Sequence, residues 1–544
     1  MAKKIVIIRN SIKIHTNLIL RPSMAIPTTA MLRPMPSKIR SFLMRGVEAD
    51  PCEVEVDLDE AALAKETIVG LPDAAIRESI ERVRAALTNT GYQFPNGRLV
   101  INLAPAHVRK EGPIYDLPIA VALLQATGVI REQRPDESPP RLHRYMFAGE
   151  LALDGRIRPV RGGIAMADLA RQEGLDAVIV PSENAAEAAV AGPSTFGVRT
   201  LAEVVGLLNG LLELEPHPPP DLGAMLRAAE APIDFAEVRG QEAVKRAIVI
   251  AAAGGHNVIM LGPAGTGKTM MARALPGILP PMSSAEAIET TRIHSAAGEL
   301  PAGEGLVATR PVRTPHHTAS AASIVGGGAV PRPGEVSLAT HGILFMDELP
   351  EFPRTVLETL RQPLEDHLVT ISRSRGTVRF PANFLFVAAM NPAPGGSAGP
   401  TAASQKAAER YRARISGPLL DRIDIHVEAP AVPWKELSAT GQSTSTSSAE
   451  MRDRVMRARA TQAARQDEGV LNGRLRGKDL DRLAPMSESA RSLRGQAIAE
   501  LGLSARAYDK VRRVARTVAD LEGAEGLDVQ HIAEAVQYRL LDRS

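Results

Sequence analysis

The residues with the clearest chemical pattern lie in the glycine-rich segment 262–269. An apolar run, Val258–Leu261, precedes this segment and predicts a short buried strand. The segment fits the pattern G-x-x-x-x-G-K-S/T with Gly262, Pro263, Ala264, Gly265, Thr266, Gly267, Lys268 and Thr269. Glycines let backbone N–H groups close around phosphate oxygens, because no side chain stands in the way. The pattern therefore predicts a loop that binds the phosphates of a nucleotide.

Two side chains of this loop have specific expected roles. Lys268 is expected to reach the β- and γ-phosphates, and Thr269 to offer its hydroxyl to Mg²⁺. An ordinary strand-to-helix turn with a lone surface lysine is the alternative. A helix-compatible run, Met270–Leu275, follows the loop, however, and the strand before it completes the context that the motif requires. The sequence thus predicts ATP and Mg²⁺ as cofactors.

A second segment, 341–348, is apolar and ends in Asp347 and Glu348. A continuous apolar run is typical of a buried parallel strand, and ligands bind at the carboxyl ends of such strands. We expect Asp347 to hold Mg²⁺ together with Thr269, and Glu348 to polarise the attacking water. An Asp-Glu pair can also be a plain helix cap, so it is informative only beside the phosphate loop. The two segments together predict a nucleoside triphosphatase.

Length and composition limit the possible classes of protein. A chain of 544 residues is too long for one hydrophobic core, so about two to four domains are expected. No segment approaches the roughly 20 apolar residues of a membrane span, and we expect no membrane partner. The single cysteine, Cys52, excludes an internal disulfide and fits the reducing cytoplasm. A net charge of +2 and 3% aromatic residues mean that nucleic-acid binding would need a local charged patch rather than a base-stacking platform.

The elements that must position these residues are predicted from periodicity and from breaks in composition. A proline-rich spacer (Pro216–Pro220) and a Ser/Thr-rich stretch (Ser438–Ser448) separate regions of regular pattern. The predicted boundaries are 1–37 for a disordered leader or upstream start (Met35 being the alternative start), 38–210 for a mixed α/β domain, 211–231 for a linker, 232–430 for the ATPase core, 431–448 for a flexible connector and 449–544 for an all-helical region.

Within the first of these domains, alternation and helical spacing predict individual elements. They are a strand at 52–58, a helix at 73–87, a strand at 99–103, a helix at 117–127, a strand at 178–180 and a helix after 182. In the ATPase core, strands alternate with helical runs. We therefore expect a parallel sheet with helices on both faces.

Three further segments resemble motifs of AAA+ ATPases. Asn391, at the end of the run 388–392, resembles the sensor 1 residue that orients the attacking water. The segment 415–424 resembles the arginine-finger segment of the helix-hairpin branch, with Arg422 as the finger. Arg506 resembles the sensor 2 arginine of a helical lid. The resemblance implies a catalytic set of Lys268, Asp347, Glu348, Asn391, Arg422 and Arg506.

The segments Thr314–Ser320 and Val325–Gly328 are similar to a signature of one family, the magnesium-chelatase-like AAA+ proteins called ComM or YifB. The segments 69–73 and 102–106 also fit the N-terminal domain of that family. The resemblance implies a homohexameric DNA motor of the branch-migration type, which acts on single-stranded or branched recombination intermediates. A magnesium-chelatase motor subunit and a protein-remodelling AAA+ chaperone are the alternatives.

The N-terminal domain resembles the proteolytic domain of Lon, which is of the ribosomal S5 domain 2 type. The segments 110–113, 149–157 and 160–163 carry this resemblance. Lon peptidases need a serine and a lysine where this chain has Ile114 and Ala165. Neither side chain can attack a carbonyl or accept a proton, so a protease is excluded. A structural or DNA-contacting collar is expected instead.

The segment 369–380 alternates and contains a glycine, so it predicts a β-hairpin. Arg373, Arg375 and Arg379 are expected at or near its tip. A solvated hairpin without a ligand is the alternative. In the AAA+ branch that the chain resembles, such a hairpin points into the pore, which implies that the three arginines bind DNA.

Metal binding by cysteine or histidine is not favoured. The family usually carries cysteines after the Asn-Pro of sensor 1, whereas this chain has Ala393 and Gly395 there and no cysteine in 396–406. His316 and His317 are adjacent, and neighbouring side chains of an extended segment point apart. We expect these histidines to be structural or to face DNA.

Overall fold

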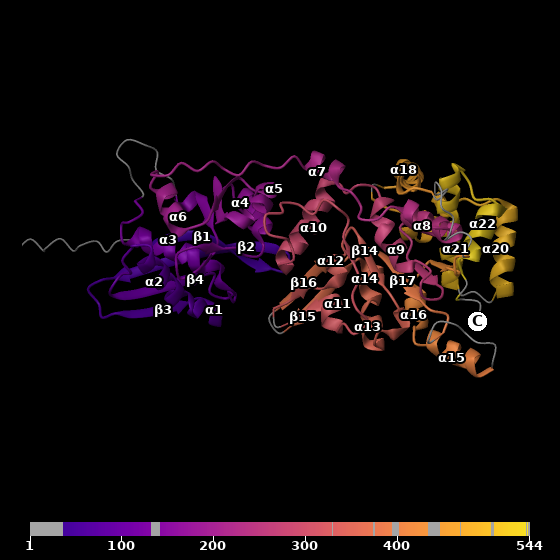
Figure 1. Cartoon of the computed structure of the whole chain (residues 1–544), viewed down its shortest axis with the longest axis horizontal. Coiled ribbons are helices and arrows are strands. Elements are labelled where there is room, and N and C mark those ends of the chain that lie inside the picture. The colour runs from indigo at the N-terminus through magenta and orange to yellow at the C-terminus, as the bar shows by residue number, and fades with distance from the viewer. Residues whose placement is uncertain are drawn as a thin grey trace, which may run out of the picture. The chain divides into compact units, whose positions relative to one another are not determined.

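The structure is a computed structural model (Figure 1). It describes residues 36–131, 142–328, 330–373, 376–393, 402–433, 446–467, 469–501, 505–539 and 541. The predicted leader lies outside these residues except for its last two positions, and so does Arg375. Within the described ranges, no helix is both long enough and apolar enough to cross a membrane.

The N-terminal domain contains a mixed seven-stranded sheet in the order β3-β4-β2-β1-β5-β8-β9. β1 and β2 pair antiparallel, as do β2 and β4, and the other neighbours run parallel. The strands are β1 Ser37–Arg45, β2 Glu48–Asp59, β3 Lys65–Val69, β4 Arg98–Ala104, β5 Tyr145–Phe147, β8 Ala177–Pro181 and β9 Ser194–Val198. The strands predicted at 52–58, 99–103 and 178–180 fall within β2, β4 and β8 and are confirmed.

The helices of this domain cover the sheet, and one differs from its prediction. They are α1 Ala74–Arg77, α2 Ser79–Asn89, α3 Asp116–Ala126, α4 Gly163–Gln172, α5 Ala185–Ala191 and α6 Leu201–Leu208. The single helix predicted at 73–87 is wrong, because the chain breaks at Glu78 into α1 and α2. Asp73 caps α1 by accepting a hydrogen bond from the Ile76 N–H at 2.9 Å. The helices predicted at 117–127 and after 182 correspond to α3 and α5.

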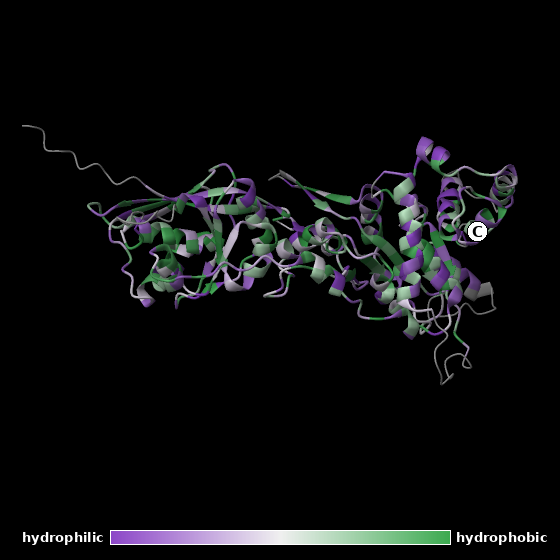
Figure 2. Cartoon of the chain, turned by 90° about the horizontal axis from the view of Figure 1, so that it is seen from above, coloured by the Kyte–Doolittle hydropathy of each residue, from purple (hydrophilic) through white to green (hydrophobic). Residues whose placement is uncertain are grey.

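The ATPase core contains five parallel strands in the order β11-β14-β17-β10-β18. They are β10 Val258–Leu261, β11 Val312–Arg313, β14 Ile343–Met346, β17 Leu385–Met390 and β18 Ile425–Glu428. The predicted parallel sheet is therefore confirmed. Figure 2 colours the chain by hydropathy and shows hydrophobic, green segments among its strands.

The alternation of side chains along strand β14 explains why its residues must all be apolar. Ile343 and Phe345 of β14 belong to the cluster of buried residues that includes helix α8 (Glu242–Gly254). Leu344 and Met346 point to the other face and join a second cluster. Helices α13 (Arg354–Thr359) and α14 (Arg361–Asp366) contribute to that second cluster. Both faces of the sheet are thus covered, as the prediction required.

The C-terminal region is helical, as its pattern predicts. It consists of α18 Ser448–Arg465, α19 Gly477–Leu483, α20 Glu488–Leu501, α21 Ala505–Glu522 and α22 Val529–Gln537. Val455 of α18, Val511 of α21 and Ile532 of α22 are fully buried in the same cluster as Ile248 of α8. These helices are therefore continuous with one face of the ATPase sheet.

The predicted linker contains a helix of its own. α7 (Leu222–Ala228) begins after Asp221, whose side chain accepts a hydrogen bond from the Ala224 N–H at 2.9 Å. Leu226 is buried in a small cluster with Met282 and Leu306. Part of the predicted linker is accordingly packed against the ATPase core.

Candidate nucleotide site

The candidate site lies at the carboxyl edge of the five-stranded sheet. β10, β17 and β14 are neighbours and run parallel, so the residues that follow them meet at one edge. The Thr269 hydroxyl donates a hydrogen bond to Asp347 Oδ2 at 2.9 Å. Lys268 Nζ lies 3.5 Å from Asn391 Oδ1. The structure thus brings together residues of three segments that are far apart in the sequence.

The phosphate loop needs glycine for two different reasons. Gly265 and Gly267 have φ angles of +80° and +84°, which lie in the left-handed region that other residues rarely adopt. At Gly262, a β-carbon would lie 2.1 Å from the Ala429 carbonyl oxygen. Gly262 therefore permits the loop to pass close to the end of β18, whereas Gly265 and Gly267 permit its turn.

Lys268 is held above the loop by backbone groups. Its Nζ donates to the Gly262 carbonyl at 2.7 Å and to the Pro263 carbonyl at 2.8 Å. Burial lowers the pKa of this ammonium, and the charges of Asp347 and Glu348 act in the opposite direction. A buried cation beside exposed loop amides is suited to an incoming polyanion.

These residues fit a nucleotide with bound Mg²⁺. Mg²⁺ prefers hard oxygen ligands and keeps several of its waters. The Thr269 hydroxyl and the Asp347 carboxylate are two such ligands on adjacent sites, joined by their hydrogen bond. The loop supplies the turned glycines and the lysine that phosphate binding requires.

The two acids after β14 point in different directions. Glu348 is exposed and has a left-handed backbone conformation, with φ 50° and ψ 48°. Its N–H donates to Asp347 Oδ1 at 3.0 Å, while Asp347 Oδ2 accepts from Thr269. A non-glycine residue in this region costs about 1–3 kcal/mol, and such strain is common at functional sites. Asp347 therefore faces the loop, and Glu348 stays accessible to water.

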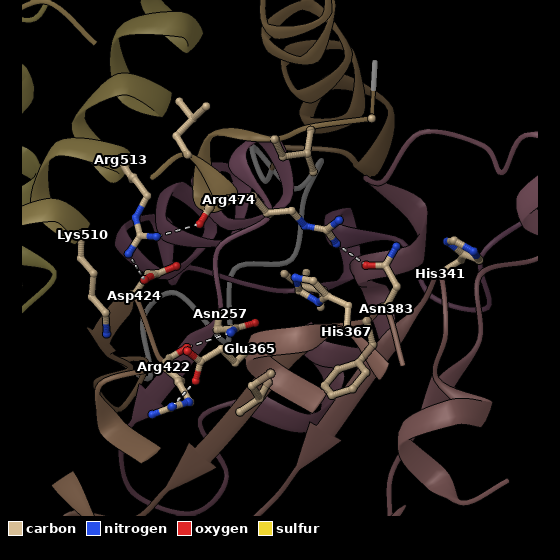
Figure 3. A pocket seen from close by; sticks show the side chains of 18 of the residues that line it. Asn257, His341, Glu365, His367, Asn383, Arg422, Asp424, Arg474, Lys510 and Arg513 are labelled. Atoms are coloured by element: carbon tan, nitrogen blue, oxygen red, sulfur yellow. Dashed lines mark hydrogen bonds and ion pairs between the residues drawn. The ribbon is translucent and has the colours of Figure 1, made fainter. Parts of the chain in front are cut away.

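Arg422 is not brought to the phosphate loop of its own chain. It lies just before β18 and therefore at the amino edge, whereas the loop follows the carboxyl end of β10. A strand of four residues spans roughly 13 Å, so the sheet separates the two. Arg422 Nη1 donates to the Pro418 carbonyl at 2.6 Å, and Nη2 pairs with Glu365 (Figure 3).

The side chain of Arg506 lies outside the described residues, although its backbone belongs to α21. Its role as a sensor 2 arginine stays a prediction. The same holds for the DNA-binding role of Arg375, whose position in the hairpin is not described.

The predicted hairpin is confirmed. β15 (Leu368–Arg373) and β16 (Gly376–Pro381) pair antiparallel, and Arg373 lies opposite Gly376. Arg379 lies opposite Thr370, three residue pairs further from the tip. Side chains alternate along each strand, so Arg373 shares a face with the buried Ile371, and Arg379 lies on the other face. Both arginines are exposed, with Arg373 at the tip and Arg379 further along β16 on the opposite face.

His316 and His317 do not point apart, so that expectation is wrong. Their ring centroids are 4.1 Å apart. The segment turns here instead of staying extended, because the Ala319 N–H donates to the His316 carbonyl at 2.9 Å. His316 Nδ1 lies 2.8 Å from the Thr318 hydroxyl. In the part of the chain that the structure describes, no group of three His, Cys, Asp or Glu side chains could hold a metal ion.

Three residues that lie beside predicted site residues were not identified from the sequence. Glu365 pairs with Arg422. Gln241, with φ 61°, donates from Nε2 to the Pro430 carbonyl at 2.6 Å and so ties the start of α8 to the end of β18. Burial, together with the charges of Glu351, Glu348 and Asp347, raises the pKa of Tyr411 to about 12. No local pattern marks any of the three, because each contact joins distant segments.

Three family models match the chain. One is described as magnesium chelatase, subunit ChlI, and matches residues 234–437. A second, described as subunit ChlI of Mg-chelatase, matches residues 54–184, and a third, for the C-terminal part of subunit ChlI, matches residues 445–539. The matches therefore cover the N-terminal domain, the ATPase core and the C-terminal helices.

Individual relatives extend along nearly the whole chain. The competence protein ComM of Haemophilus influenzae is 42% identical over 504 residues, which cover 92% of this chain and 96% of the relative. The uncharacterized protein YifB of Salmonella typhimurium is 42% identical over 501 residues, with the same coverage of 92% and 96%. The magnesium-chelatase 67 kDa subunit of Heliobacterium mobile is 24% identical over 236 residues, which cover 37% of this chain and 31% of the relative.

Proposed function

Because the chain belongs to the ComM/YifB family of magnesium-chelatase-like AAA+ proteins, we propose that it is an ATP-driven ring motor that translocates DNA. The proposed reaction is branch migration of recombination intermediates, by a homohexamer. One relative is named as a competence protein, which supports a DNA-related role. The observation that carries the proposal is the position of Arg422, since a finger at the far edge of the sheet needs the nucleotide of another copy.

In the proposed hydrolysis, each residue of the carboxyl edge has one task. Bound Mg²⁺ would neutralise charge on the phosphates, with Thr269 and Asp347 as its protein ligands. Lys268 binds phosphate oxygens, and Asn391 beside it orients the attacking water. Glu348 accepts a proton from that water, for which its exposed, turned position is suited. Arg422 of a neighbouring copy stabilises the charge that develops on the transferred phosphoryl group.

The hairpin supports DNA as the polymer. Arg373 and Arg379 are exposed, and neither guanidinium forms an ion pair with a carboxylate among the described residues. Exposed arginines without a carboxylate partner on a two-stranded ribbon are suited to phosphate oxygens of a nucleic acid. The net charge of +2 gives no general attraction, so such a local contact would have to supply it. The N-terminal domain is proposed to be a Lon-like collar without proteolytic activity.

Stimulation of ATP hydrolysis by DNA tests the proposal. We expect single-stranded or branched DNA to raise the hydrolysis rate of the wild-type protein. An Arg373→Ala/Arg379→Ala double variant should lose this stimulation while its rate without DNA stays unchanged. Arg361→Ala is the matched control, because Arg361 is an exposed arginine of α14 that pairs only locally with Glu358 at 3.0 Å. Absence of DNA stimulation in the wild-type protein would contradict the proposal.

A magnesium-chelatase motor subunit is the second candidate, since the matching family models are described by that enzyme. The chelatase subunit of Heliobacterium mobile matches only 37% of this chain, however, whereas ComM matches 92%. Stimulation of hydrolysis by a chelatase partner subunit, and not by DNA, would favour this candidate. Stimulation by unfolded protein alone would favour a protein-remodelling chaperone.

A further inference from the structure

A cavity of about 580 Å³ lies at the amino edge of the ATPase sheet, on the side opposite the phosphate loop. Its lining includes Asn257 before β10, Asn383 before β17 and Asp424 before β18. The C-terminal helical region contributes Arg474 and Arg513 from the other side (Figure 3). The cavity is therefore built jointly by the sheet and by the helices that pack on it.

The lining carries more positive than negative charge. Seven lysine and arginine residues line it, against five aspartate and glutamate residues. Glu286 is paired with Arg310 at 3.1 Å, and Glu365 is paired with Arg422. By contrast, Arg474, Arg476 and Lys510 have no carboxylate within ion-pair distance in the described ranges of the chain. The cavity thus has cations that the protein itself does not neutralise.

The pKa values of His367 and Lys510 reflect this excess of positive charge. Burial and the charges of Arg474 and Arg476 lower the pKa of His367 to about 4, so its ring is neutral at physiological pH. Burial, opposed by Asp424 and reinforced by Arg539 and Arg513, lowers the pKa of Lys510 to about 8. An anion in the cavity would relieve the repulsion that these groups share.

Two buried nitrogen donors in the lining residues also lack a hydrogen-bond partner in the described part of the chain. Arg422 Nε and Arg513 Nε are inaccessible to solvent, and neither has a hydrogen-bond partner among the residues that the structure describes. An unsatisfied buried donor costs about 1–3 kcal/mol, so a small shift of either guanidinium group toward an acceptor in the cavity would be favoured. Both nitrogens belong to residues that line the cavity.

Part of the remaining lining is apolar and accommodates more than a simple ion. The apolar part is formed by Leu279, Leu364, Phe384, Leu385, Leu471 and Leu475, beside polar side chains such as Asn257 and Asn383. A cavity of this volume, with an apolar wall and a few convergent charges, is typical of sites for small organic ligands. A ligand with both a flat apolar ring and phosphate groups matches the two kinds of wall.

We propose that this cavity is a second nucleotide-binding site, separate from the phosphate loop, in which Arg474, Arg476 and Lys510 bind the phosphates of a nucleoside diphosphate or triphosphate. The bound nucleotide would join the ATPase sheet to the C-terminal helices. It would also lie beside the segment that holds Arg422, because Lys510 Nζ donates to the Ile423 carbonyl at 3.1 Å. This nucleotide would bind from solution, in addition to the nucleotide at the phosphate loop.

The test is nucleotide binding by a Lys268→Ala variant, whose phosphate loop has lost its lysine. A fluorescent ADP derivative should still bind with one saturable site per chain, and pyrophosphate should compete. Arg474→Ala and Arg476→Ala, added to this variant, should weaken the residual binding at least about tenfold, since each removes charge-assisted hydrogen bonds. Arg474 and Arg476 are exposed, so folding should not depend on them.

Arg482→Ala is the matched control, because Arg482 is an exposed arginine of α19 that does not line the cavity. It should leave the binding unchanged. Absence of saturable binding in Lys268→Ala would overturn the proposal. In that case, slower hydrolysis caused by Arg474→Ala or Arg476→Ala in the otherwise wild-type protein would mean that the cavity contacts the nucleotide of a neighbouring copy and does not bind a nucleotide itself. Residual binding that is unaffected by Arg474→Ala and Arg476→Ala would be binding at the phosphate loop. This result would also overturn the proposal.

Discussion

The two edges of the ATPase sheet differ in how their charged side chains are paired. At the carboxyl edge, the polar side chains are bonded to one another, as in the Thr269–Asp347 hydrogen bond of 2.9 Å. At the amino edge, Arg422 is held by Glu365 beside a cavity with surplus positive charge. One chain thus carries the residues that we propose to bind and hydrolyse a nucleotide, and also the proposed finger, Arg422, at the opposite edge of the sheet. This division supports the proposal that a complete site combines opposite edges of two copies.

The largest effect is expected at the amino edge. Arg422→Ala should slow ATP hydrolysis by about 10³-fold, because an arginine finger stabilises the transition state to that extent in related systems. Nucleotide binding at the phosphate loop should be retained, since Arg422 does not contact it. Steady-state hydrolysis and equilibrium ATP binding are the measurements, with Arg361→Ala as the control. A rate near that of the wild-type protein would make the Glu365–Arg422 pair purely structural.

At the carboxyl edge, Glu348→Gln should slow hydrolysis at least about 100-fold, the usual scale for loss of a general base. ATP binding should persist, because Asp347 and Thr269 keep their contact. Glu351→Gln is a matched control, since Glu351 is a nearby acid that pairs with Arg414 at 2.8 Å. Near-normal turnover in Glu348→Gln would remove Glu348 from the mechanism.

A moderate effect is expected for the hairpin, which forms a two-stranded sheet of its own. Each phosphate contact on single-stranded DNA contributes about −0.7 to the slope of log affinity against log salt concentration. Arg373→Ala and Arg379→Ala should each flatten this slope and weaken binding about equally for two unrelated oligonucleotides. The same is expected for Arg375. Because Arg373 and Arg379 lie on opposite faces, a change in only one of them would show which face contacts the strand. An unchanged slope in all variants would place the DNA elsewhere.

The smallest effect concerns stability at the amino edge. Burial would lower the pKa of His341, but its hydrogen bonds with Glu286 and Glu289 outweigh burial and raise the pKa to about 9. Burial would likewise raise the pKa of Glu286, but the hydrogen bond with His341 and the charge of Arg310 lower it to about 2. The stabilisation by protonated His341 is therefore complete below pH 6.5, its unfolded value, and is lost as the pH rises through about 9.

His341→Asn should thus destabilise the protein by about 1–3 kcal/mol at pH 6.5 and by much less at pH 10. Asparagine tolerates the positive φ of 59° at this position, so the backbone should not change. Urea unfolding of both proteins at the two pH values measures the difference. An equal difference at both values would mean that His341 contributes packing and not charge.

The sequence predicts those parts of the fold that depend on local pattern. The apolar run before the phosphate loop and the run before Asp347 are the strands β10 and β14, and their shared edge follows from parallel pairing. The break between α1 and α2 could not be predicted, because the helical spacing of Ile76 and Ile80 continues across Glu78. The close approach of the His316 and His317 rings depends on a turn at 316–319, whereas the prediction assumed an extended segment.

The parts of the site that the sequence does not predict are contacts between distant segments. Glu365 and Arg422 are 57 residues apart, and Gln241 and Pro430 are 189 residues apart. Neither periodicity nor a local motif reports such pairs, because they arise only when the sheet assembles. The cavity at the amino edge has the same origin, since its cations come from loops before strands and from C-terminal helices.

The division between the two edges is tested most directly by mixing two inactive variants. Lys268→Ala lacks a working carboxyl edge, and Arg422→Ala lacks a working finger. If a complete site uses one edge from each of two copies, mixed assemblies should regain part of the wild-type ATPase activity, because some contacts unite an intact Lys268 with an intact Arg422. Mixtures that remain inactive, although the two variants demonstrably assemble together, would contradict the account.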